Sequence, residues 1–137
     1  MNAIPNFHDG YLTGVRLRDK SATIYVQRVD GVNYEIGLVG LEALQAEDFR
    51  QGNIISAVEV IVGCTPSEYI EFDRLFPPPH PDTAKKYHRA HALFVQRQRG
   101  RIERGEISLL VINPSYGADL LATCLEITCV ESDPNGS

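Results

Sequence analysis

Three histidines have the residue type, and in part the spacing, that a metal site requires. His88 and His91 stand three positions apart, so a helix would present both imidazoles on one face. With His80, or with His8-Asp9 near the N-terminus, they would supply three ligands and leave one coordination position open. At helical spacing both fall among apolar side chains, which is more typical of core histidines. A small metal-dependent enzyme or metal-binding protein using His80, His88 and His91 is therefore an alternative hypothesis.

No other pattern of catalytic residues stands out. The sequence contains no Gly-x-Ser-x-Gly elbow, no Walker phosphate loop and no Gly-x-Gly-x-x-Gly loop. Glu59 lies in a β-branched run, where a buried carboxyl would need a partner or a raised pKa. The commoner arrangement is a solvent-facing Glu59 paired across strands with Arg16 or Arg28. The sequence favours a protein that is not an enzyme, and we expect no catalytic residue and no cofactor.

Charge is divided unevenly along the chain. Seven of the 13 lysine and arginine residues lie between Lys85 and Arg104, with Glu103 as the single acid among them. This segment carries +6, whereas the whole chain carries −5, so the remainder carries −11. The division indicates one cationic surface on an otherwise acidic body.

A helix through this segment would be amphipathic. At about 100° per residue, the apolar and histidine side chains share one arc, and most cations share the opposite arc. Leu93 is the exception, because it projects among the cations on the side that should face water. An apolar residue inside a charged rim is the usual composition of a contact patch. We predict that a partner binds on five residues of this face: Lys86, Arg89, Leu93, Arg97 and Arg101.

The partner class follows from the same charges. Binding of nucleic acid through Arg89, Arg97 and Arg101 is a weaker alternative, because the chain is net acidic and no aromatic-rich stacking motif accompanies the arginines. We therefore expect a protein partner or self-association, including a homodimer. A basic helix on an acidic body would allow two copies to associate either head to tail or around a two-fold axis.

The first half of the chain, residues 1–63, has the alternation of an antiparallel β-meander. Strands are predicted near 11–18, 22–29 and 34–38, with Asp30-Gly31 as the hairpin turn between the last two. Residues 41–49 fit either a short helix or a loop. A long β-branched run at 54–62 predicts a central strand covered on both sides.

The second half, residues 64–137, is predicted as helix, helix, strand, strand. A capping box at Thr65–Glu68 predicts a short helix that ends near Phe76, and Pro77–Pro81 then separates the two helices. Asp82 or Thr83 would cap the basic helix, which would end at Arg99 or Arg104. Strands are expected at 108–112 and 120–130, with turn residues at 113–117 between them.

Two short motifs resemble known proteins. Phe7-His8-Asp9-Gly10 before a strand, together with the run from Phe49 to Ile55, resembles a set of small bacterial proteins of unassigned function. Some similar small α+β proteins are immunity proteins, which bind and neutralise a cognate toxin. The resemblance covers about a dozen positions. It implies a stoichiometric protein-binding role without catalysis, and it transfers no site residues.

Length and composition complete the expectation. A chain of 137 residues with 43% hydrophobic content predicts one folded domain, 1–137, rather than disorder. No apolar run reaches the ~18 residues of a membrane span, and the first residues lack the pattern of a secretory signal. Three cysteines without metal or redox spacing suit the cytoplasm. We predict the α+β class: a mainly antiparallel sheet of five to six strands, with one long amphipathic helix packed on a face of the sheet and one short helix.

Overall fold

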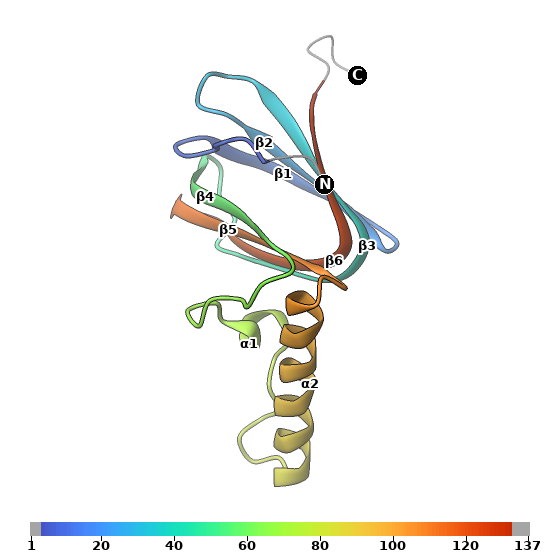
Figure 1. Cartoon of the computed structure of the whole chain (residues 1–137). Helices are drawn as coiled ribbons and strands as arrows, with labels where there is room; N and C mark the ends of the chain where they lie inside the picture. The colour runs from blue at the N-terminus through green and yellow to red at the C-terminus, as the bar shows by residue number, and fades with distance from the viewer. Residues whose placement is uncertain (1–3, 133–137) are drawn as a thin grey trace.

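The computed structural model describes residues 4–132, which form a six-stranded antiparallel barrel and two helices (Figure 1). The strand order around the barrel is β1-β2-β3-β6-β5-β4, and β4 returns to β1. Both helices are inserted between β4 and β5 and lie outside the barrel, below the wall that β5 and β6 form. The α+β class, the antiparallel sheet and the pair of one long and one short helix are confirmed. The closure of the sheet into a barrel goes beyond what the sequence predicted.

The first three strands form the predicted meander. They are β1 (Tyr11–Arg18), β2 (Ser21–Gln27) and β3 (Asn33–Glu47). Alternate residues of β2 are buried, as expected for a strand with one face toward a core. The hairpin at Asp30-Gly31 is confirmed: Gly31 has a φ of 89°, and the Asp30 carboxylate accepts a hydrogen bond from the Val32 amide at 3.1 Å.

Residues 41–47, for which the sequence allowed a helix or a loop, belong to β3. The strand continues because it pairs with β6 along most of its length. Gly40, with a φ of 67°, and a bulge between Leu41 and Ala43 interrupt the regular ladder. At such a bulge the strand can bend without losing its partner, and Figure 1 shows β3 and β6 curving together around one side of the barrel.

The remaining strands are β4 (Asn53–Ile61), β5 (Ser108–Tyr116) and β6 (Asp119–Glu131). Residues 113–116, predicted as a turn, extend β5, and the chain reverses at Gly117, where φ is 85°. Leu110 and Ile112 of β5 point into the barrel, whereas Leu109 and Val111 lie beneath the helices. Residues 108–112 of this strand are therefore buried on both faces.

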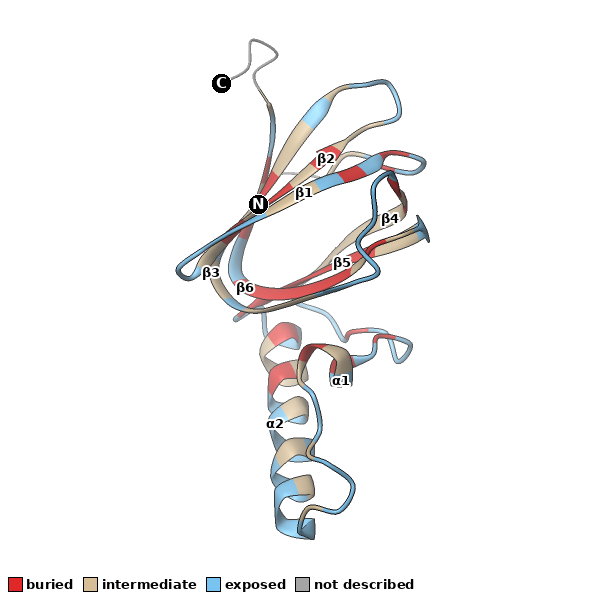
Figure 2. Cartoon of the chain, turned by 180° about the vertical axis from the view of Figure 1, so that it is seen from behind, coloured by how far each residue is buried: buried red, intermediate tan, exposed pale blue. Residues whose placement is uncertain are grey.

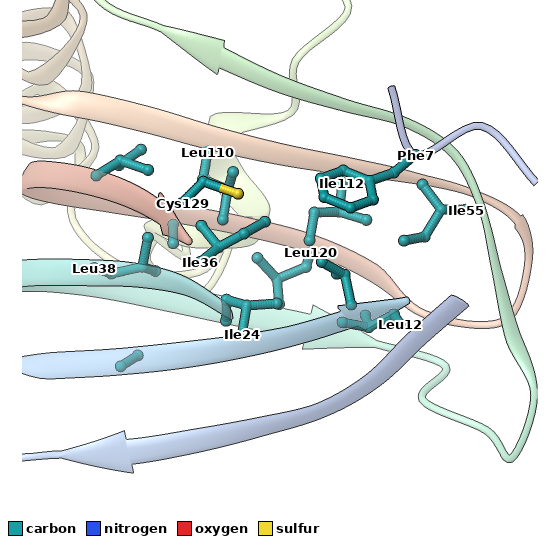
Figure 3. Close-up of a cluster of buried hydrophobic side chains, with 14 of the residues drawn as sticks. Phe7, Leu12, Ile24, Ile36, Leu38, Ile55, Leu110, Ile112, Leu120 and Cys129 are labelled. Atoms are coloured by element: carbon teal, nitrogen blue, oxygen red, sulfur yellow. The ribbon is translucent and has the colours of Figure 1, made fainter. Parts of the chain in front are cut away.

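Two hydrophobic clusters hold the protein together. The larger cluster fills the barrel (Figure 3), and Phe7 joins it with an edge-to-face contact of 5.3 Å to Tyr34. The smaller cluster lies outside the barrel wall. It joins side chains within or next to the two helices with outward residues of the wall: Ile70, Phe72, Leu75, Ile102, Ile107, Leu109, Val111 and Leu121.

The helices begin differently from the prediction. The short helix α1 covers only Phe72–Leu75. No helix starts at Pro66, because the Thr65 hydroxyl that was expected to cap it donates instead to the Glu103 carboxylate at 2.6 Å. The long helix α2 covers Lys85–Glu103 and has Ala84 at its N-cap without a side-chain cap, so neither Asp82 nor Thr83 caps it. Gly105, with a φ of 76°, follows its end.

The barrel closes at a short contact between β1 and β4. Only two residue pairs join them, Tyr11 with Ile54 and Leu12 with Asn53. The buried Asn53 side chain strengthens this contact. Its Oδ1 accepts from the amides of Arg50 at 2.7 Å and Ala118 at 2.9 Å, and its Nδ2 donates to the carbonyls of Leu12 and Arg50. One amide therefore ties three separate segments together.

Replacement of Asn53 by Ala is expected to destabilise the protein by about 2–4 kcal/mol, because buried backbone groups lose their partners. Urea unfolding followed by circular dichroism measures the change. Asn113→Ala is the matched control, since this half-buried amide forms no side-chain hydrogen bond with the described residues, and it should cost less than about 1 kcal/mol. Equal effects of the two substitutions would contradict the role given to Asn53.

Burial in the barrel raises the pKa of the Cys124 thiol from 9.0 to about 11. Above pH 9 the unfolded chain loses a proton that the folded chain keeps, so this thiol lowers stability as the pH rises from 9 to 11. The urea midpoint of the wild type is expected to fall more steeply over this interval than that of Cys124→Ala. Parallel pH profiles would show that Cys124 does not contribute.

Candidate functional site

Helix α2 extends away from the barrel. Of its residues only Gln98 and Ile102 are buried, and both lie in its last two turns. Figure 2 shows the burial decreasing along the helix from the end near the barrel to the end farthest from it. The sequence predicted a helix packed along one face of the sheet. The structure instead anchors it at one end, because the outer wall offers apolar partners only to the last turns and to α1.

The anchored end of α2 is held by polar as well as apolar contacts. The Arg101 guanidinium donates two hydrogen bonds to the Glu42 carboxylate of β3, at 2.7 and 2.8 Å. These bonds lower the pKa of Glu42 and raise that of Arg101. The Arg99 guanidinium lies 4.3 Å from the centre of the Phe72 ring. Both arginines are therefore occupied within the chain.

The middle of α2 packs against the segment that follows α1. The Phe76 and Phe94 rings meet edge to face at 5.1 Å. His91 Nε2 lies 2.7 Å from the Phe76 carbonyl oxygen, so this nitrogen carries the hydrogen and donates it. His88 Nε2 is buried without a hydrogen-bond partner among the described residues. These contacts cover the histidine side of the helix and leave the opposite side to solvent.

The predicted histidine metal site is not assembled. His91 bonds to the Phe76 carbonyl, and His80 Nδ1 accepts from the Asp82 amide at 3.1 Å. His8, the other candidate, lies near the barrel, where its Nδ1 is 2.9 Å from the Ser56 carbonyl oxygen. Within residues 4–132, no group of three histidine, cysteine, aspartate or glutamate side chains is placed to hold a metal ion.

The outer face of α2 consists of Lys86, Arg89, Leu93 and Arg97, and all four are exposed. Leu93 is 60% exposed, so it stands where the sequence predicted it. No described residue forms an ion pair with any of the three cations. Lys86 has one ring contact, with Nζ 5.0 Å from the centre of the Tyr87 ring. Four of the five predicted contact residues therefore share one solvent-facing surface, whereas Arg101 turns to Glu42.

Glu59 faces outward, as the sequence favoured, but it pairs with neither Arg16 nor Arg28. It is half-buried on the outside of β4 and accepts a hydrogen bond from the Tyr69 hydroxyl at 3.2 Å. Its partner is thus a tyrosine of the connection to α1 rather than Arg16 or Arg28. The sequence did not predict this contact, because cross-strand pairing was the basis of the prediction and Tyr69 lies outside every predicted strand.

Comparisons of the chain with protein-family models, curated proteins and solved structures give no match. No family is therefore assigned, and function is inferred from the surfaces of the molecule. Among the described residues, neither helix has the length and apolar character needed to cross a bilayer.

The Glu42–Arg101 pair is expected to contribute at most about 1 kcal/mol to the free energy of unfolding, because both side chains are partly solvated. A double-mutant cycle with Glu42→Gln and Arg101→Gln, read by urea unfolding at pH 7, measures the coupling. Since the pair lowers the pKa of Glu42, its contribution is present above pH 4.5 and is lost as the pH falls further. Arg97→Gln is the control and should show no coupling to Glu42. A coupling that stays constant down to pH 3 would contradict the assignment.

Proposed function

We propose that this protein is a non-enzymatic protein-interaction domain whose outer α2 face docks a partner protein. The observation that carries the proposal is an exposed Leu93 among cations that have no ion-pair partner among the described residues. Leu93 would enter an apolar contact of the partner, and the cations would surround it as a polar rim.

The partner is proposed to be acidic around that contact. Unpaired lysines and arginines gain most from carboxylates, and long-range attraction between opposite charges speeds association. A two-fold pairing of the α2 outer face with itself would instead place Arg89 and Arg97 against like charges, which costs energy. A homodimer through this face is therefore disfavoured. Neutralisation of an acidic toxin, as an immunity-type protein, is one form of this role.

The proposal favours protein over nucleic acid. The cations of the outer face are few, and the chain outside residues 85–104 carries −11, so the long-range field opposes a polyanion. The exposed leucine would also find no apolar contact on a phosphate backbone. The odd number of cysteines and their spacing support the cytoplasm as the compartment. Metal-dependent chemistry at His80, His88 and His91 would require the hydrogen bonds that now engage His80 and His91 to be broken.

The experiment is a pull-down from the lysate of the native host with purified protein. The wild type is expected to retain one acidic protein, and the triple substitution Arg89→Ala, Leu93→Ala, Arg97→Ala is expected to lose it. The same chain offers a matched control on β1. Arg16 and Arg18 are exposed without ion pairs among the described residues, and Leu17 is 63% exposed, so alanine at these three positions removes the same side chains elsewhere.

Each outcome bears on the proposal. Loss of the captured protein with the α2 variant but not with the β1 variant supports docking on the outer face. Equal retention by all three proteins contradicts it. Capture of an oligonucleotide instead, with affinity that falls steeply with salt and with the α2 substitutions, would favour the nucleic-acid alternative.

A further inference from the structure

A second exposed surface lies at the barrel end where β1 meets β4, far from α2. Tyr11 of β1 is directly opposite Ile54 of β4, and Ile54 is directly opposite Tyr116 of β5. Directly opposed residues of paired strands share one face of a sheet. Their neighbour Leu12 is buried in the barrel, so the three-residue row points outward. Tyr11 is 42% exposed and Tyr116 50%. Two aromatic rings therefore flank a half-buried isoleucine on the outer surface.

A groove of about 500 Å³ adjoins this row, between the start of β1 and residues 49–53. Tyr11 and Phe49 supply its aromatic walls, and Arg50 lies at its edge with its guanidinium 5.9 Å from the centre of the Tyr116 ring. The charge of Arg50 is met by Asp48 at 2.7 Å. The four hydrogen bonds of Asn53 hold this loop in place beside β1, so the groove is preformed.

The chain also carries an exposed segment of the kind that aromatic grooves bind. Pro77–Pro81 reads Pro-Pro-Pro-His-Pro, and all but the half-buried Pro79 are exposed. Consecutive prolines favour the polyproline II helix, whose peptide groups stay unpaired and whose rings project at a repeat of about 9.3 Å for three residues. Pro78 and Pro81 stand one such repeat apart. Aromatic-lined grooves recognise this Pro-x-x-Pro pattern because the segment is already ordered before it binds.

We propose that Pro77–Pro81 of one copy of this chain docks across the Tyr11–Ile54–Tyr116 row of a second copy. Two neighbouring strand spacings separate the flanking tyrosines by about 9.6 Å, which matches the polyproline repeat. Charge is complementary as well: Asp9 and Asp48 next to the row outweigh Arg50, whereas Lys85 and Lys86 follow the prolines without ion-pair partners among the described residues.

The contact has to be intermolecular. Figure 1 shows the segment between α1 and α2 beside the long helix, below the barrel wall, whereas the starts of β1 and β4 and the end of β5 meet at one end of the barrel. The segment is fixed beside α2 by the contacts of Phe76, so it does not reach the row of its own chain. Because donor and acceptor surfaces differ, the association is head to tail and builds open chains or rings. Of the outer α2 face it uses Lys86 alone, and it does not involve Arg89, Leu93 or Arg97.

Stacking of single-stranded nucleic acid on the same rings is the competing use of such a surface. The row lacks what that use requires, since its one cation is neutralised by Asp48 and Asp9 adds a negative charge. The proline segment is therefore the occupant that the charges favour, and an oligonucleotide becomes one outcome of the test.

The test uses sedimentation velocity on the full chain up to about 1 mM, where contacts with dissociation constants as weak as about 1 mM are seen. The wild type is expected to form larger species as its concentration rises. A row variant (Tyr11→Ala, Tyr116→Ala) and a proline variant (Pro78→Ala, Pro81→Ala) are each expected to remain monomeric. An equimolar mixture of the two should form a one-to-one dimer and nothing larger, because it retains one intact tyrosine row and one intact proline segment per pair.

Two controls make the result specific. Tyr69→Ala removes an exposed tyrosine elsewhere and should associate like the wild type. Far-ultraviolet circular dichroism should show that both test variants remain folded. A wild type that stays monomeric throughout, variants that associate like the wild type, or a mixture without dimers would each overturn the proposal. So would oligonucleotide binding that requires Tyr11 and Tyr116 while the protein does not self-associate.

Discussion

The pairing of β3 with β6 is the interaction on which the rest of the structure depends. Twelve residue pairs join these strands, and the two strands belong to opposite halves of the chain. They curve together (Figure 1), and Gly40 and the bulge after Leu41 interrupt the regular ladder. A flat ladder of this length would leave two sheet edges exposed. The curved ladder brings β1 round to β4, where a short contact and the hydrogen bonds of Asn53 close the barrel.

Closure also decides where the helices go. Once the inward residues of the strands fill the barrel, the helices can pack only on its outer wall. Leu109 and Val111 of β5 provide a small apolar area there, large enough for α1 and the last turns of α2. The other turns of α2 extend into solvent alongside the proline segment. The exposed outer face therefore follows from the limited area that the barrel wall offers, and Leu93 remains outside either hydrophobic cluster.

The two proposed surfaces differ in how far local sequence reveals them. Lys86, Arg89, Leu93 and Arg97 are neighbours on one helix, so helical periodicity alone places them together. Tyr11, Ile54 and Tyr116 come from three strands, and their alignment depends on the register of two pairings. Arg101 shows the limit of periodicity within a single helix: it belongs to the cationic side by angle, yet it donates two hydrogen bonds to Glu42 of a distant strand.

The sequence by itself determined the strands, the hairpin at Asp30-Gly31, the extent of the basic helix and the position of Leu93, because these depend on alternation, turn chemistry and helical angle within a few residues. Tertiary structure decided the barrel, the extension of β3 through residues 41–47 and the hydrogen bond between His91 and the Phe76 carbonyl. It also decided how the helices begin, since Thr65 bonds to Glu103 instead of capping α1. Each of these features joins residues far apart in the chain. Local periodicity predicts which side of a helix or strand is apolar, but it does not predict which other element packs against that side.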